Sequence, residues 1–239
     1  MRTNAVPGFL PSTHGFAFAN AWPPGPTVRL GPLDPRRVGI ADASAGLCGG
    51  MVMTVRDLFE AGLTAAGRVQ PENGTPPFQA IVRRQVQSLD FFRVPLRYYD
   101  LMAFRPDPPR GLARLLRREP PRVRSVDREW QAIREGLDAG RLVPLGLIRT
   151  SSARPRQLAL NHQVLAYAYD AADDGSRFAI RIYDPNHPRR DDVELRAEVD
   201  PDDGRPLRER IRLEQSTGEP LLGFFVQPYP RPSGVRAWR

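Results

Sequence analysis

The chain has 239 residues, of which 41% are hydrophobic, a length and composition typical of one globular domain rather than of a disordered chain. Its formal net charge is +8, and all 35 basic residues are arginine. These arginines are scattered among 26 prolines instead of gathering with aromatic residues, so the composition argues against nucleic-acid binding and fits the codon usage of a GC-rich genome.

The first 40 residues predict an extended lead-in. Aromatic residues alternate in GFAFANAW, residues 15–22, which favours one or two short strands. The N-terminus lacks the continuous apolar core and the cleavage site of a signal peptide, and no run reaches the roughly 18–20 apolar residues of a membrane span. We therefore expect a cytoplasmic protein, with non-classical export left open. A single cysteine agrees with a reducing compartment.

The next segments carry helical periodicity. Apolar residues at 51, 52, 55, 58 and 59 mark one face of a helix that ends near Gly62, with Arg56, Asp57 and Glu60 on the opposite face. Similar patterns predict helices over residues 76–89 and 94–104.

Residues 105–124 form an Arg/Pro-rich segment with seven arginines and five prolines. Because proline interrupts helices, we expect a solvated surface loop that carries a short helix. A contact surface for an acidic partner is the alternative interpretation. A further helix is expected over residues 125–140, with Ser125 as its N-cap, Glu129 near the third helical position, and Gly140 at its end.

After residue 140 the pattern changes to short apolar runs and to alternation typical of strands. The runs are LVPLGLIRT, QLALNHQVLAYAYD, RFAIRIYD, DVELRAEV and LLGFFVQPY. DAADDGS, residues 170–176, predicts a hairpin turn from its Asp-Gly content. Helices followed by a largely antiparallel sheet predict an α+β fold over one domain, residues 1–239.

Three local sequences bring together residues with nucleophilic chemistry. In GLCGGM, Cys48 precedes a helix, whose positive N-terminal end lowers the pKa of a thiol. Gly49 and Gly50 predict open space for a substrate to approach the sulfur. In LNHQVLAYAYD, His162 stands near the start of a strand, and in IRIYDPNHP Asp184 follows the next strand. If these strands form a hairpin, Asp184 lies near His162 and is able to orient the imidazole toward the thiol.

These motifs resemble those of the papain-like cysteine peptidases, with most similarity to the bacteriocin-processing branch of that superfamily. The resemblance covers roughly residues 40–190 and rests on GLCGG, NHQVLAYAYD and YDPNHP in that order. LCGGM, NHQVLAYAYD and YDPNHP together are also similar to a family of uncharacterised bacterial proteins. The peptidase resemblance implies a papain-like fold in which Cys48 is the nucleophile, His162 the general base and Asp184 the orienting residue, with Asn186 as the alternative orienter.

The resemblance also exposes a departure in the region that binds the oxyanion. The peptidases place a glutamine six residues before the cysteine, and its amide donates a hydrogen bond to the oxyanion. This chain has Asp42 there, and an ionised carboxylate repels developing negative charge. A protonated Asp42, or donation by Ser44, Asn20 or a backbone N–H, would restore the function.

The sequence therefore predicts a papain-like cysteine hydrolase or acyl transferase that acts on an amide, thioester or isopeptide bond of a peptide-like or acyl substrate. The alternative is a catalytically impaired papain-like fold that serves as a binding or structural module, which Asp42 favours. We expect no cofactor and no metal, because no closely spaced pair of metal ligands is present. The oligomeric state is not determined by the sequence.

Overall fold

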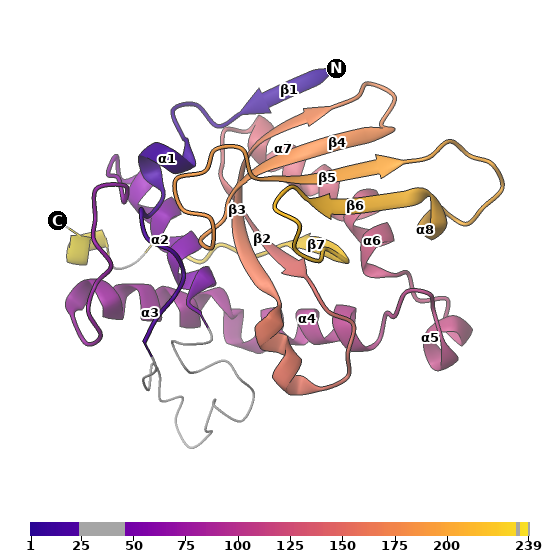
Figure 1. Cartoon of the computed structure of the whole chain (residues 1–239), viewed down its shortest axis with the longest axis horizontal. Helices are drawn as coiled ribbons and strands as arrows, with labels where there is room; N and C mark the ends of the chain where they lie inside the picture. The colour runs from indigo at the N-terminus through magenta and orange to yellow at the C-terminus, as the bar shows by residue number, and fades with distance from the viewer. Residues whose placement is uncertain (24–45, 233–234, 239) are drawn as a thin grey trace.

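Helices and a single antiparallel sheet form an α+β fold, as the sequence predicted (Figure 1). The structure is a computed structural model, and it describes residues 1–23, 46–232 and 235–238. The helices are α1 (Pro11–His14), α2 (Cys48–Glu60), α3 (Pro76–Ser88), α4 (Arg93–Ala103), α5 (Gly111–Leu115), α6 (Pro121–Arg124), α7 (Trp130–Asp138) and α8 (Leu207–Arg210). The strands are β1 (Arg2–Ala5), β2 (Val143–Ile148), β3 (His162–Ala171), β4 (Arg177–Tyr183), β5 (Glu194–Val199), β6 (Ile211–Gln215) and β7 (Gly223–Val226).

In the described part of the chain, the strands follow the order β6-β5-β4-β3-β2-β7, and every neighbouring pair is antiparallel. β1 pairs with the C-terminal part of β3, whereas β2 pairs with its N-terminal part. β3 is therefore the central strand, and its first eight residues are all buried because it is covered on both faces. The DAADDGS turn joins β3 to β4 as predicted.

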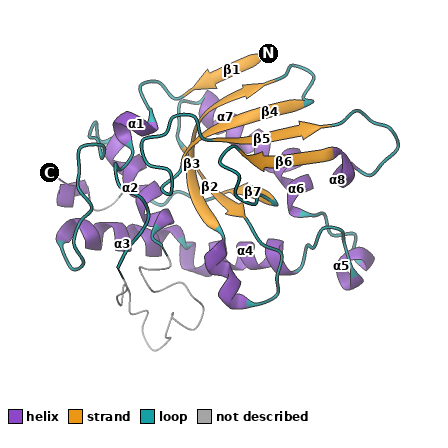
Figure 2. Ribbon diagram, viewed as in Figure 1, coloured by secondary structure: helices purple, strands orange, loops and turns teal. Residues whose placement is uncertain are grey.

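The helices lie in two groups around the sheet. α2 and α3 pack against each other beside one end of β3, whereas α6 and α7 lie behind the strands (Figures 1 and 2). Trp130 of α7 stacks on Phe178 of β4 with ring centroids 4.2 Å apart, and Ile133 and Leu137 are fully buried beside them. The predicted apolar face of this helix is thus confirmed.

The predicted polar face of α2 is wrong at two of its three residues. Arg56 and Asp57 are buried, because α3 and the C-terminal segment cover the side of α2 that faces away from the sheet. Asp57 forms an ion pair with Arg84 of α3 at 2.9 Å, and both side chains are at most 2% exposed. Tyr229 donates a further hydrogen bond to Asp57 over 2.6 Å. Arg56 and Asp57 therefore belong to the interior, whereas Glu60 at the end of the helix is exposed as predicted.

The predicted capping box at Ser125 is also wrong. α6 begins at Pro121 and runs through a π-helical turn, Ser125–Glu129, directly into α7. Ser125 Oγ instead accepts a hydrogen bond from the N–H of Phe224 at 2.7 Å and lies 2.9 Å from the Pro121 carbonyl. The hydroxyl therefore joins the helix to β7 rather than beginning the helix.

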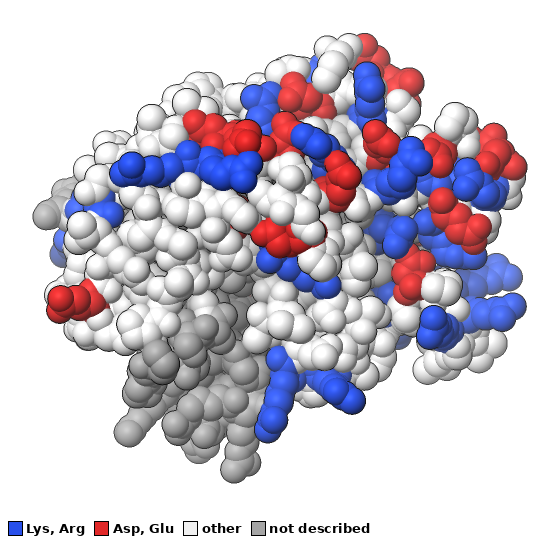
Figure 3. Space-filling model, in the orientation of Figure 1, with Lys and Arg blue, Asp and Glu red and all other residues white. Residues whose placement is uncertain are grey.

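The N-terminal and Arg/Pro-rich segments each differ in part from expectation. The lead-in contains the strand β1, but GFAFANAW is irregular, and residues 24–45 lie outside the described residues. In residues 105–124, Arg105 and Arg118 both pair with Asp100, at 2.6 and 3.0 Å, so part of the positive charge is neutralised. Basic and acidic side chains are interspersed on the face shown in Figure 3. None of the described helices combines the length and apolarity needed to cross a bilayer.

Candidate active site

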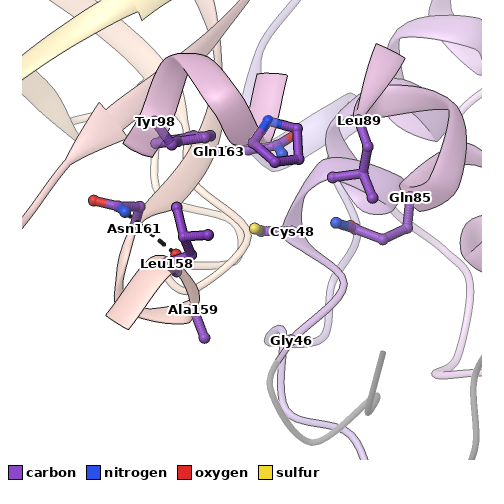
Figure 4. A pocket seen from close by; sticks show the side chains of 10 residues that line it. Gly46, Cys48, Gln85, Leu89, Tyr98, Leu158, Ala159, Asn161 and Gln163 are labelled. Atoms are coloured by element: carbon purple, nitrogen blue, oxygen red, sulfur yellow. Dashed lines mark hydrogen bonds between the residues drawn. The ribbon is translucent and has the colours of Figure 1, made fainter. Parts of the chain in front are cut away.

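Cys48 is the first residue of α2, and a network around Asn20 fixes the turn before it. Gly46 adopts a φ of +93°, a conformation that favours glycine, and the N–H of Leu47 donates to Asn20 Oδ1 over 2.7 Å. The Cys48 side chain is partly exposed, and its sulfur points into a pocket (Figure 4). The thiol therefore stands at the positive end of a 13-residue helix with access to solvent.

The two glycines after Cys48 do not provide the predicted open space for a substrate. A Cβ atom on Gly49 would lie 2.2 Å from Gln163 Oε1, and one on Gly50 would lie 2.2 Å from the backbone oxygen of Ile81. Both glycines are buried, and they allow α2 to pack closely on β3 and α3. Their role in the fold is close helix packing, which corrects the substrate-approach assignment.

His162 and Asp184 are brought together by the β3–β4 hairpin. His162 is the first residue of β3, and Asp184 follows the last residue of β4, so the antiparallel pairing returns the carboxylate to the histidine. His162 Nε2 and Asp184 Oδ1 are 2.6 Å apart. His162 is 4% exposed and Asp184 is fully buried. Nε2 is therefore engaged with the carboxylate, which leaves Nδ1 for the thiol.

The Asp184 carboxylate is held by further donors. The N–H of Asn186 donates to Oδ1 over 2.8 Å, and Nε2 of Gln215 in β6 donates to Oδ2 over 3.0 Å. A guanidinium nitrogen of Arg149 lies 3.9 Å from Oδ2. The Asn186 side chain accepts a hydrogen bond from Asn20, so Asn186 contributes its backbone here and not the orienting side chain considered as an alternative.

Asp184, His162 and Cys48 shift one another's pKa values. Burial alone would lower the pKa of His162, but the charge and hydrogen bond of Asp184 outweigh it and raise that pKa to about 9. Burial would raise the pKa of Asp184, yet the neighbouring His162 lowers it to about 2. Burial likewise opposes ionisation of Cys48, but a hydrogen bond with His162 and N–H groups of Gln163 and Gly49 lower its pKa. The arrangement therefore makes the Cys48 thiol easier to ionise than an isolated cysteine.

Tyr98 of α4 completes the support for the histidine. Its hydroxyl donates to the backbone carbonyl of His162 over 2.7 Å and accepts from Gln227 at 3.3 Å. Burial raises the pKa of Tyr98 well above its ordinary value, so the hydroxyl remains a donor. The start of β3 is therefore fixed by a hydrogen bond from a helix as well as by the sheet.

A pocket of about 70 Å³ surrounds the sulfur. Leu158 and Ala159 lie on one side of Cys48, and Gln85 of α3 and Leu89, which follows that helix, lie on the other (Figure 4). The remaining lining residues are Gly46, Pro95, Tyr98, Asn161 and Gln163. The walls are mainly apolar with a few amide groups, as is usual for sites that bind small molecules.

Three of the residues considered for the oxyanion region do not line the described pocket or lie outside the described residues. Asp42 and Ser44 lie outside the described residues. The amide nitrogen of Asn20 is directed to Asn186 at 3.4 Å, and Asn20 does not line the pocket. Over the described residues, no group of three His, Cys, Asp or Glu side chains is arranged to hold a metal ion.

Sequence reasoning missed several groups that complete the site. Gln215 stands in β6, a strand that was not predicted although IRLEQ alternates weakly in polarity. Gln85 lies within the helix predicted over residues 76–89, where a polar residue at a position of the apolar stripe was the signal available for it. Tyr98 carried no local signal, because its role depends on the contact of α4 with β3.

Comparison with protein-family models, curated proteins and solved structures finds no significant match to this chain.

Proposed function

We propose that this protein is a papain-like cysteine hydrolase or acyl transferase that cleaves an amide, thioester or isopeptide bond through a thioester on Cys48. The observation that carries the proposal is the series Cys48–His162–Asp184, in which the thiol stands at a helix N-terminus and His162 is 2.6 Å from a buried carboxylate. Cys48 comes from a helix that precedes the strands bearing the other two residues, the chain order of the papain-like enzymes that the motifs resemble.

In the first half of the reaction the Cys48 thiolate attacks the carbonyl carbon of the substrate. The carbon–oxygen double bond opens, and its electron pair resides on the oxygen of a tetrahedral intermediate. The intermediate collapses, the bond to the leaving group breaks, and the His162 imidazolium gives its proton to that group. The products are a thioester at Cys48 and a neutral imidazole.

In the second half, an acceptor attacks the thioester. Water gives hydrolysis, whereas an amine or thiol gives acyl transfer. Neutral His162 removes the proton from the attacking group, and the second tetrahedral intermediate expels the Cys48 thiolate. The imidazolium–thiolate pair is thereby restored. Throughout, Asp184 keeps the ring oriented and compensates the positive charge of the imidazolium.

The pocket supports a small or extended acyl group as substrate. Its volume of about 70 Å³ is small, and Leu89, Leu158 and Ala159 offer apolar contacts close to the sulfur. A narrow site of this kind fits a peptide segment or an acyl chain laid across Cys48 better than a bulky rigid ligand.

Labelling with iodoacetamide tests the proposal directly. The native protein is treated across pH 5–10, and the modified residue is identified by mass spectrometry. We expect rapid alkylation of Cys48 well below pH 8, because His162 and the N–H groups around the sulfur lower the thiol pKa. His162→Ala should slow this labelling. His187→Ala is the matched control, because His187 pairs with Glu219 at 2.5 Å instead of with Asp184.

The same protein is then incubated with p-nitrophenyl acetate, and the acetylated residue is located by mass spectrometry. Acetyl-Cys48 that forms and decays supports the acyl-transfer chemistry. The proposed function would be contradicted if Cys48 were alkylated only in denaturant, or if the native thiol were alkylated but never acylated. Either result would favour a binding or structural module.

A further inference from the structure

The site as described contains a nucleophile, a base and an orienting carboxylate, but it still requires donors for the oxyanion. Gln85 of α3 lines the same pocket as Cys48. It follows Cys48 in the chain, whereas Asp42, at the position where the peptidases have their glutamine, precedes it. Its side chain is nine-tenths buried, with 9% of its surface exposed. A buried amide at the pocket wall has a fixed direction, which is the requirement for stabilising a transition state.

The orientation of the Gln85 amide follows from its contact with α2. The N–H of Gly50 donates to Gln85 Oε1 over 2.8 Å. A backbone N–H requires an acceptor, so this contact assigns the oxygen to the helix side and turns the NH₂ group the other way. Figure 4 shows the nitrogen of Gln85 directed toward the Cys48 sulfur. The described residues provide no hydrogen-bond acceptor for this nitrogen.

A second donor lies at the same point. Cys48 is the first residue of α2, and the N–H groups of the first turn of a helix have no partner within the helix. The N–H of Gly50 is taken by Gln85, and that of Gly49 faces the sulfur. The N–H of Cys48 itself has no acceptor among the described residues. It therefore stands beside the sulfur together with the Gln85 amide.

We propose that Gln85 Nε2 and the backbone N–H of Cys48 form the oxyanion-binding site, so that Gln85 supplies the amide donor that is missing at Asp42. When the thiolate attacks, the substrate's carbonyl oxygen gains negative charge and accepts hydrogen bonds from both groups. No proton is transferred to or from Gln85. This inference rests on the proposed acyl transfer at Cys48.

The competing role for Gln85 is to hold the first turn of α2, because it accepts the Gly50 hydrogen bond. Two variants separate these roles. Gln85→Glu keeps an oxygen acceptor for Gly50 but removes the amide donor, whereas Gln85→Met removes both. Gln79→Met is the matched control, since Gln79 is exposed on the same helix.

The experiment measures two rates on each protein at the same pH. One is the acylation of Cys48 by p-nitrophenyl acetate, which passes through an oxyanion. The other is alkylation by iodoacetamide, which displaces iodide at a saturated carbon and develops no oxyanion. Dividing acylation by alkylation removes any effect of the substitution on the thiolate fraction. We expect this ratio to fall about 100- to 1000-fold in both Gln85 variants and to stay unchanged in Gln79→Met.

Each outcome decides the matter. A wild-type ratio retained in Gln85→Glu and Gln85→Met overturns the role of Gln85 and leaves the proposed function intact. Equal loss of acylation and alkylation assigns Gln85 to holding α2 and also overturns the inference. If Cys48 of the wild-type protein is alkylated by iodoacetamide but is never acylated, the proposed function is overturned, and the oxyanion-binding site with it.

Discussion

Asp184→Asn tests the electrostatic link between the carboxylate and the thiol. The pKa of His162 is raised from 6.5 to about 9, and Asp184 is the main cause of the rise. One pKa unit corresponds to about 1.4 kcal/mol, so the imidazolium is stabilised by about 3 kcal/mol. An asparagine keeps the shape of the side chain and removes its charge. The imidazolium then loses most of this stabilisation, and the Cys48 thiolate loses its positive partner.

The first assay is the rate of iodoacetamide alkylation against pH. At pH 8 we expect Asp184→Asn to label up to about 30-fold more slowly than wild type, because an imidazole whose pKa returns to about 6.5 is charged in only about 3% of molecules there, against about 90% when its pKa is about 9. At pH 5, where the imidazole is protonated in both proteins, the rates should converge. Asp192→Asn is the control, since Asp192 follows β4 in the same segment but is 71% exposed and pairs with Arg190. Identical profiles for Asp184→Asn and wild type would refute the reasoning.

Thermal unfolding provides an independent check with a defined sign. The folded-state pKa of His162 is raised, so its contribution to stability is fully present below pH 6.5 and is lost as the pH rises through about 9. The folded-state pKa of Asp184 is lowered, so its contribution is present above pH 3.8 and is lost as the pH falls through about 2. The difference in Tm between wild type and Asp184→Asn should therefore be largest between about pH 4 and 6.5. A difference that grows above pH 9 would contradict the assignment.

Three further expectations follow from the same geometry. Hydrolysis of an amide substrate should decline above about pH 9, because His162 there loses the proton that the leaving group needs, whereas alkylation of Cys48 should continue. Measurement of kcat/KM up to pH 10 checks this. Hydrolysis and alkylation rates that follow the same pH profile would count against the role of His162 as the acid. Gly50→Ala should lower the free energy of unfolding by about 1–3 kcal/mol, because the new Cβ meets the backbone oxygen of Ile81 at 2.2 Å; an unchanged midpoint in urea would exclude that clash. Asp57→Asn should cost about 3–5 kcal/mol, because it leaves the buried Arg84 guanidinium without its anionic partner, and wild-type stability in the same titration would show that the pair is dispensable.

The sequence allowed the hairpin and the positions of its ends to be predicted. Alternation in NHQVLAYAYD and RFAIRIYD, with an Asp-Gly turn between them, is enough to place Asp184 near His162, and the two are in hydrogen-bond contact. The start of α2 was also predictable from its apolar periodicity. Both features depend on residues that are close in the chain, where turn chemistry and periodicity act directly.

Features that depend on distant segments were not predicted correctly. Arg56 and Asp57 are polar, and periodicity places them on a solvent face, yet α3 and Tyr229 cover that face and supply charged and hydroxyl partners. Ser125 resembles an N-cap, but a preceding helical turn and the β7 backbone use its hydroxyl instead. The amide of Gln85 acquires its direction only from the N–H of Gly50, 35 positions earlier.

The placement of the chain's single cysteine has a consequence for experiments on folding. The groups that lower the pKa of Cys48 belong chiefly to β3, whereas the thiol itself belongs to α2. The reactivity that we expect of this thiol thus depends on whether the helix has docked on the sheet. A pulse of alkylating agent during refolding would time that docking in the wild-type chain, with no label to introduce and no second thiol to remove.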